Sequence, residues 1–217
     1  MQLAGWQSRG ILHGFSSPEN PPTTLPLPIR IRQVHGHQCL EVSASSASPA
    51  GAADALISMS PGVAVGVATA DCVPILLSTP RADAVAAIHA GWRGTLANIS
   101  DTVVQSLRNR DVPAADLHAA IGPSIGPCCF EVENDFATRF VDAFGEESRR
   151  YWQDGREGHG YLDLRGLNQM LLERAGIPTR SIDQVGPCTF CGDGSFASYR
   201  RDGKQAGRQL SWIRTAG

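Results

Sequence analysis

The feature that most constrains this chain is a series of short apolar segments that end in reactive side chains. Between Val63 and Thr95 the sequence reads VAVGVATADCVPILLSTPRADAVAAIHAGWRGT. Apolar segments of this length, bounded by Pro, Gly and Asp, are typical of buried strands. The first segment ends at Asp71 and Cys72, and the third ends at His89. The pattern therefore predicts a rigid sheet that presents a thiol and an imidazole at its edge.

The order of the predicted elements favours an α+β fold built from mixed β-sheets. Apolar or alternating segments predict strands at 9–15, 29–35, 39–42, 55–59, 63–68, 75–78, 84–88, 117–121, 182–185 and 209–213. Helical spacing of apolar residues predicts helices at 95–110, 134–144 and 163–175. The strands come in runs with few helices between them, which disfavours a regular βαβ alternation. We expect a single domain over residues 1–217, in which the proline-rich segment 16–28 is an ordered connector.

The composition excludes several classes of partner. The chain has 42% hydrophobic and 18% charged residues and a net charge of −2, which is ordinary for a globular protein. A pI near 6.3 does not indicate a nucleic-acid partner or an anionic membrane surface. The first residues lack a signal-peptide pattern, and the apolar runs are too short for a membrane span. The six cysteines are then expected to remain thiols, and the protein to be cytoplasmic.

Three side chains at predicted strand ends could form a metal site. His35, Cys72 and His89 supply two imidazoles and a thiolate. A catalytic zinc typically has three such ligands and one open position. These ligand types would also accept copper. The alternative is a buried free cysteine beside two hydrogen-bonded histidines.

A second pattern indicates an anion site. The turn from Gly91 to Gly94, with Arg93 inside it, precedes a predicted helix. Exposed N–H groups at a helix N-terminus attract anions without any net positive charge on the chain. Arg200 and Arg201 could add a bidentate grip. The alternative is that the glycines only form a turn.

The remaining thiols and carboxylates give weaker signals. Cys188 and Cys191 form a C-x-x-C motif but have no obvious second pair, so we interpret them as structural or incidental. The adjacent pair at 128–129 would point to opposite sides of an extended segment, which also favours no shared role. Asp71 is the carboxylate best placed to orient a histidine or accept a proton. Asp163 is expected to cap the helix that follows it.

Taken together, the segments resemble the laccase-domain family, also described as multicopper polyphenol oxidase-like or YfiH-like. The matching segments are HGFS (13–16), QVHG (33–36), ADALIS (53–58), TADCVPILL (69–77), AAIHAGWRGT (86–95), IGPSIGPCCFEV (121–132), DL (163–164), CT (188–189) and SYRRDG (198–203). They occur in the family's order. The TADC and HAGWRG motifs are specific to it.

The resemblance implies an α/β/β/α sandwich of mixed sheets, distantly similar to toxin deamidases. It implies zinc on His35, Cys72 and His89. It further implies phosphorolysis of purine nucleosides (adenosine, inosine and methylthioadenosine) and deamination of adenosine. Longer members carry about forty more residues between HGFS and QVHG, where this chain has only the proline-rich connector. This difference affects the expected nucleoside pocket and leaves the metal triad intact.

The leading hypothesis is a zinc-dependent purine nucleoside phosphorylase and deaminase, a monomer or homodimer that takes a nucleoside and phosphate. Gly91, Arg93 and Gly94 would bind phosphate together with Arg200 or Arg201, and Asp71 would accept a proton. One alternative is a cysteine amidase that removes a wrongly incorporated serine from a peptidoglycan precursor, with Cys72 as nucleophile and His89 or His35 as base. Copper-dependent phenol oxidation is a further alternative, although one triad lacks the extra histidines of a multicopper cluster.

Overall fold

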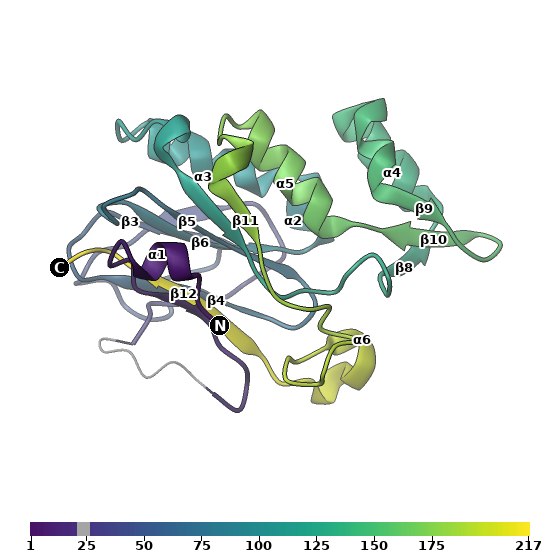
Figure 1. The fold of residues 1–217 in the computed structure, drawn as a ribbon, viewed down its shortest axis with the longest axis horizontal. Coiled ribbons are helices and arrows are strands. Elements are labelled where there is room, and N and C mark those ends of the chain that lie inside the picture. Colours follow the sequence, from purple (N-terminus) through teal and green to yellow (C-terminus); the bar gives the residue numbers. More distant parts are fainter. Residues whose placement is uncertain (21–26) are drawn as a thin grey trace.

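A six-stranded mixed sheet forms the centre of the molecule (Figure 1). The computed structural model describes residues 1–20 and 27–217, so part of the predicted connector, residues 21–26, lies outside the described residues. In sheet order the strands are β11 (Ile182–Gln184), β7 (His118–Ile121), β5 (Val73–Ser78), β6 (Val85–Ala90), β3 (Ala55–Ser58) and β2 (Cys39–Glu41). The two outer pairs are parallel and the inner pairs are antiparallel. The predicted α+β fold with mixed sheets is confirmed.

Helices cover one face of this sheet. They are α2 (Trp92–Leu96), α3 (Ile99–Arg108) and α5 (Leu164–Arg174). Successive side chains of a strand point to opposite faces. Ile75 and Leu77 of β5 therefore face the helices, where they join Val103, Leu107 and Leu171 in one fully buried cluster.

A second sheet covers the other face, opposite α3 and α5 in Figure 1. Its antiparallel strands are β1 (His13–Phe15), β12 (Gln209–Arg214) and β4 (Ala64–Thr69). Leu56 and Leu76 of the central sheet pack with Val65 and Ile213 of the second sheet, and α1 (Ala4–Gln7) adds Trp6. Because both faces of the central sheet are buried, its strands have continuous apolar sequences.

Smaller elements lie at the edges of these layers. A third sheet, in the order β8 (Glu131–Glu133), β10 (His159–Leu162) and β9 (Trp152–Asp154), accompanies α4 (Asp135–Phe144). The helix α6 (Tyr199–Asp202) precedes β12, and 3₁₀ turns occur at Ala114–Asp116, Glu146–Tyr151, Thr179–Ser181 and Gly203–Gln205. Within residues 1–20 and 27–217, none of the helices is long and apolar enough to cross a membrane.

The strand predicted at 29–35 is wrong. Ile29 bridges Val65 of β4, whereas Arg32 bridges Ala52, so the segment passes between two partners and forms a ladder with neither. The alternation of apolar and polar residues reflects an extended chain with one buried side, which does not require a sheet.

The helix predicted at 95–110 is two helices. It begins earlier, at Trp92, and is interrupted between α2 and α3 at Asn98, which adopts a left-handed conformation with φ of 55°. The Asn98 side chain accepts a hydrogen bond from the Asp101 N–H, which caps α3. The predicted cap at Asp163 is confirmed, because its side chain accepts a hydrogen bond from Gly166 N at 2.9 Å.

Replacing Leu76 with alanine should lower the free energy of unfolding by about 2–5 kcal/mol, because the side chain is fully buried between two sheets that cannot collapse into the gap. Denaturant unfolding measures the loss. Leu12→Ala is the matched control, since Leu12 is 48% exposed and should change the free energy by less than about 0.5 kcal/mol. Equal effects of the two substitutions would contradict this packing.

Candidate metal centre

The strand register brings the site residues together. In the central sheet β6 pairs with β5 on one side, where His89 lies opposite Pro74, and with β3 on the other, where Ile88 lies opposite Ala55. Cys72 immediately precedes β5, and Asp54 immediately precedes β3. Residues at the ends of adjacent antiparallel strands are neighbours in space. The pairing of β6 with β5 and with β3 therefore places a thiol and a carboxylate on either side of one histidine.

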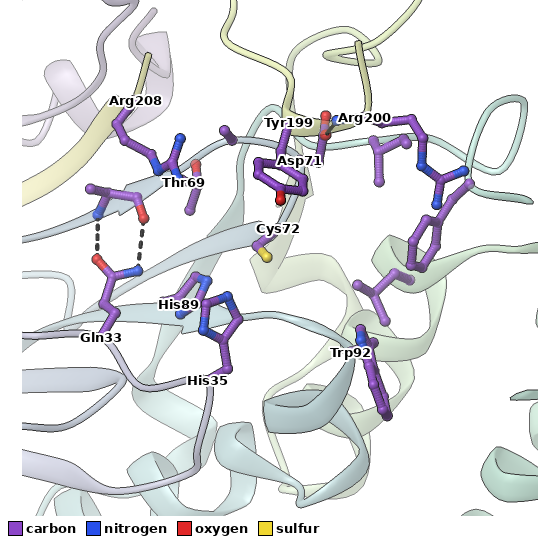
Figure 2. A pocket seen from close by; sticks show the side chains of 15 residues that line it. Gln33, His35, Thr69, Asp71, Cys72, His89, Trp92, Tyr199, Arg200 and Arg208 are labelled. Carbon is purple, nitrogen blue, oxygen red and sulfur yellow. Dashed lines mark hydrogen bonds between the residues drawn. The ribbon is translucent and has the colours of Figure 1, made fainter. Parts of the chain in front are cut away.

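His35, Cys72 and His89 form one compact group. Their potential ligand atoms all lie within 4.8 Å of one another. Figure 2 shows the sulfur of Cys72 turned toward the two imidazole rings, whose centroids are 4.8 Å apart in an edge-to-face arrangement. His35 has a left-handed backbone with φ of 58°, which is uncommon for a residue other than glycine and is frequent at functional sites.

Asp54 holds two of these residues in place. Its fully buried carboxylate accepts a hydrogen bond from His89 Nδ1 at 2.7 Å. It also accepts backbone N–H bonds from His35 at 2.9 Å and Gly36 at 2.6 Å. With Nδ1 of His89 engaged, Nε2 is the ring nitrogen left to face Cys72. One carboxylate therefore sets both the tautomer of His89 and the position of the loop that carries His35.

The pKa values of Cys72 and His89 favour a negatively charged thiolate next to a positively charged imidazolium. Burial opposes the charged form of Cys72, but hydrogen bonds from His35 and His89 outweigh burial and lower the pKa of the thiol to about 6. Burial also opposes protonation of His89, yet its hydrogen bonds to Asp54 and Cys72 raise its pKa to about 9. Between these values a thiolate lies beside an imidazolium.

This donor set fits a metal ion. Two imidazoles and a thiolate that converge from three segments match the three-ligand pattern of catalytic zinc sites. The hydrogen bond between the Asp54 carboxylate and Nδ1 of His89 leaves Nε2 for the metal, and such a carboxylate partner commonly accompanies metal-binding histidines.

Two glycines of the GWRG turn allow this convergence. A Cβ on Gly91 would lie 3.2 Å from Cys72 Sγ and 3.3 Å from Cδ2 of His35. A Cβ on Gly94 would lie 2.7 Å from the carbonyl oxygen of Gly36, which is too close for any side chain. The turn therefore packs directly against the triad and against the loop of His35.

The triad lies in a cavity of about 620 Å³, between Gln33 and Arg208 at one end and Trp92 and Arg200 at the other (Figure 2). The cavity is lined by Gln33, His35, Ala68, Thr69, Ala70, Asp71, Cys72, His89, Trp92, Ile125, Phe130, Leu164, Tyr199, Arg200 and Arg208. Its wall combines aromatic and apolar side chains with two guanidinium groups and the candidate metal ligands.

Of the three arginines predicted to bind phosphate, only one lines the cavity. Arg200 lines the cavity, where its guanidinium lies 5.6 Å from the centre of the Phe130 ring. Arg93 stacks on Trp92 at 4.4 Å, and neither it nor Arg201 belongs to the cavity lining. Arg201 instead donates to the carbonyl oxygens of two loop residues, Thr189 at 3.0 Å and Phe196 at 3.1 Å.

Asp71 also lines the cavity, and both of its carboxylate oxygens have partners. Oδ1 accepts from the Thr189 hydroxyl at 2.6 Å, and Oδ2 accepts from the backbone N–H of Arg200 at 2.6 Å. Its backbone is left-handed, with φ of 80°. Asp71 therefore ties the TADC segment to the loop of Thr189 and to the first turn of α6.

Sequence analysis missed other residues of the site. Asp54 was part of a matching motif, but an acidic residue before an apolar strand resembles an ordinary turn residue. Gln33 exchanges two hydrogen bonds with the backbone of Ala68, at 2.7 and 2.8 Å, and so fixes the start of the His35 loop. Tyr199 and Arg208 line the cavity without any local pattern that indicates it.

The prediction that Cys188 and Cys191 have no second pair is wrong. Cys128, Cys129, Cys188 and Cys191 form a second group whose sulfur atoms lie within 4.8 Å of one another. The segment that contains Cys128 and Cys129 is a turn closed by hydrogen bonds to the Gly126 carbonyl oxygen, so the two side chains do not alternate as they would in an extended chain.

Comparisons with known proteins show what the whole chain is similar to. Residues 24–216 match the family model described as multi-copper polyphenol oxidoreductase laccase. The chain is 40% identical over 185 residues to a purine nucleoside phosphorylase of Deinococcus radiodurans, a match that covers 85% of this chain and 68% of that protein. It is 38% identical over 160 residues to the adenosine deaminase RL5 of an unknown prokaryotic organism, covering 74% of this chain and 61% of that protein.

Solved structures show the same fold. The Bacillus licheniformis hypothetical protein YfiH superposes with a TM-score of 0.87 at 26% identity, over 97% of this chain and 94% of that one. The structure of YlmD from Geobacillus stearothermophilus superposes with a TM-score of 0.81 at 33% identity, over 87% and 73% of the two chains.

In metal-free protein, alkylation of Cys72 by iodoacetamide should accelerate as pH rises through about 6, because the thiolate is the nucleophile and forms above its pKa. Mass spectrometry of the labelled peptide gives the rate. Cys39 is the internal control, since burial raises its pKa to about 12.

Asp54→Asn should move the Cys72 midpoint to higher pH, since His89 loses the partner that keeps it protonated. The same substitution should weaken metal binding about 10–100-fold. A Cys72 midpoint at the ordinary cysteine value in the unsubstituted protein would contradict the ion pair.

Proposed function

Since the chain belongs to the multi-copper polyphenol oxidoreductase laccase family, we propose that it is a zinc-dependent purine nucleoside phosphorylase that also deaminates adenosine. The observation that carries this proposal is the group of His35, Cys72 and His89, held by Asp54 at the base of a nucleoside-sized cavity. The names of the phosphorylase and deaminase relatives support the same chemistry.

The cavity suits a purine nucleoside. Its volume of about 620 Å³ is within the usual range for small-molecule sites. Phe130 and Tyr199 offer aromatic faces on which a purine could stack. Adenosine, inosine and methylthioadenosine are the proposed substrates.

We assign phosphate binding to the arginines of the cavity lining. Arg200 and Arg208 both line the cavity and can form charge-assisted hydrogen bonds with phosphate oxygens. Gly91 and Gly94 are proposed to act through close packing against the triad, as their missing side chains allow. Arg93, which stacks on Trp92, and Arg201, which donates to the carbonyl oxygens of Thr189 and Phe196, are not part of this phosphate assignment.

The proposed chemistry uses the residues as follows. A zinc ion held by His35, Cys72 and His89 would supply Lewis-acid activation of water or of a substrate oxygen. In phosphorolysis, a phosphate oxygen bonds to the ribose anomeric carbon while the purine leaves with the electrons of the glycosidic bond and takes up a proton. In deamination, water adds to the purine carbon and ammonia leaves. Asp71, oriented by Thr189 and by the Arg200 N–H, is the proposed proton acceptor.

Zinc-loaded protein incubated with adenosine and phosphate should produce adenine with ribose 1-phosphate, and inosine with ammonia. Chromatography of the products measures both reactions. Cys72→Ala and His89→Ala should reduce both rates by about 10²–10³-fold or more, the usual cost of removing a preorganised catalytic group. Cys39 lies outside both cysteine-containing groups, so Cys39→Ala should leave both reaction rates unchanged. Absence of all four products at high protein concentration would reject the proposal.

Arg208→Ala should raise the KM for phosphate about 10–100-fold, the cost of one charge-assisted hydrogen bond, and leave adenosine deamination unaffected because that reaction uses no phosphate. Arg93→Ala is the matched control and should change neither reaction, since Arg93 stacks on Trp92 outside the lining. The reverse result, with phosphate KM raised only by Arg93→Ala, would restore the GWRG turn as the phosphate site.

A cysteine amidase is the second candidate, favoured by one specific observation. Cys72, His89 and Asp54 occur in the order nucleophile, base and orienting carboxylate, and the pKa of Cys72 is lowered to about 6. Its substrate would be a peptidoglycan precursor that carries a wrongly incorporated serine. Amide hydrolysis that survives metal removal and ends when Cys72 is alkylated would favour this candidate over the phosphorylase.

Copper-dependent phenol oxidation has less support. Across residues 1–20 and 27–217, histidines and cysteines gather into two groups, and the second contains no histidine. A multicopper cluster needs further imidazole ligands beyond those of the triad.

A further inference from the structure

The second thiol group lies between two loops. Cys128 and Cys129 belong to the turn that follows β7, and Cys188 and Cys191 belong to the segment that follows β11. Their four sulfur atoms lie within 4.8 Å of one another. We propose that these four thiolates bind a second, structural zinc ion. This inference is independent of the proposed nucleoside chemistry.

The spacing of the sulfur atoms fits tetrahedral coordination. Zinc–sulfur bonds of about 2.3 Å place the corners of a tetrahedron about 3.8 Å apart. Cys128 Sγ and Cys191 Sγ are already 3.6 Å apart, and no pair of sulfurs exceeds 4.8 Å. Small side-chain rotations would therefore complete the tetrahedron. A tetrahedral set of four sulfurs is typical of zinc or iron, and disfavours copper(II), magnesium or calcium.

The backbone is folded for this convergence. The N–H groups of Cys129 and Phe130 both donate to the Gly126 carbonyl oxygen, at 3.0 and 2.9 Å, which curls the first segment into a turn. Gly192 N donates to the Cys188 carbonyl oxygen at 2.9 Å and closes the second turn. A Cβ on Gly126 would lie 3.3 Å from Cys128 Sγ, so the glycine leaves room for the sulfur atoms.

Charges around the group also favour a cation. The Gly126 N–H donates to Cys188 Sγ at 3.2 Å, a hydrogen bond that favours the thiolate form a metal ligand needs. Four thiols at this spacing cannot all ionise by themselves, whereas a divalent cation would permit it. The guanidinium of Arg165 would offset part of the remaining negative charge.

The site would fasten one wall of the catalytic cavity. Ile125 and Phe130, which flank the first turn, line that cavity. Thr189, inside the second, donates its hydroxyl hydrogen to Asp71 at 2.6 Å. A metal that joins the two turns would therefore hold the apolar wall and the TADC segment in a fixed relation.

Metal analysis by mass spectrometry tests the proposal on the full chain, purified under reducing conditions and loaded with zinc. The unsubstituted protein and Cys39→Ala should each bind about two zinc ions per chain. Cys72→Ser and the double variant Cys188→Ser/Cys191→Ser should each bind about one. Cys72→Ser should lose the ion of the triad, and the double variant should lose the ion of the four-cysteine group. Adding Asp54→Asn should therefore weaken binding of the ion that remains in the double variant, and should leave the ion that remains in Cys72→Ser unaffected.

A cobalt spectrum keeps the test decisive if the double variant does not fold. In Cys72→Ser, which leaves the second group intact, cobalt(II) should produce the strong thiolate-to-cobalt charge-transfer absorption of a four-sulfur site. Absence of that absorption would overturn the proposal, as would a zinc content that the double substitution leaves unchanged. Iron in place of zinc in protein isolated from cells, or a disulfide between Cys128 and Cys191 in the reduced preparation, would also overturn it.

Discussion

The arrangement of the site depends on the hydrogen bond between a buried carboxylate, Asp54, and a buried imidazole, His89. A buried charge is tolerated only when its oxygens have partners, and Asp54 obtains them from His89 and from the N–H groups of the QVHG loop. Satisfying this one carboxylate therefore brings His35 to His89. The proposed metal chemistry, or the alternative nucleophile chemistry, uses a geometry that the folded chain has already stabilised.

The layers around the central sheet explain why this geometry is rigid. β5 and β6 have apolar residues packed on both faces, by the helices on one side and by the second sheet on the other. Catalytic groups at the ends of such strands lose little orientation to thermal motion, which is the main requirement for preorganised catalysis. The loops that complete the cavity are joined to this core by polar contacts, as Thr189 and the Arg200 N–H are joined to Asp71.

Sequence reasoning predicted the parts of this structure that depend on burial. The strands around Cys72 and His89 are continuous apolar segments, so these strands and their ends were predicted correctly, and the role of the two side chains as metal ligands stays a prediction. Sequence reasoning failed to predict contacts in which the direction of a side chain depends on the path of a turn. Cys128 and Cys129 converge only because their segment curls, and Asp54 reaches His89 only because β3 lies beside β6. The short strands of the third sheet and the break at Asn98 follow from local packing and backbone conformation, which hydrophobic periodicity does not encode.

The attachment of Gln33 to the backbone of Ala68 has a consequence for the history of the chain. Because Gln33 and Asp54 fix both ends of the QVHG loop, the position of His35 is set by residues downstream of the connector. The length of the stretch before Gln33 is then free of selection for triad geometry. A chain with a shorter or longer stretch there could therefore present the same three converging side chains, because the contacts that position the His35 loop come from Gln33 and Asp54.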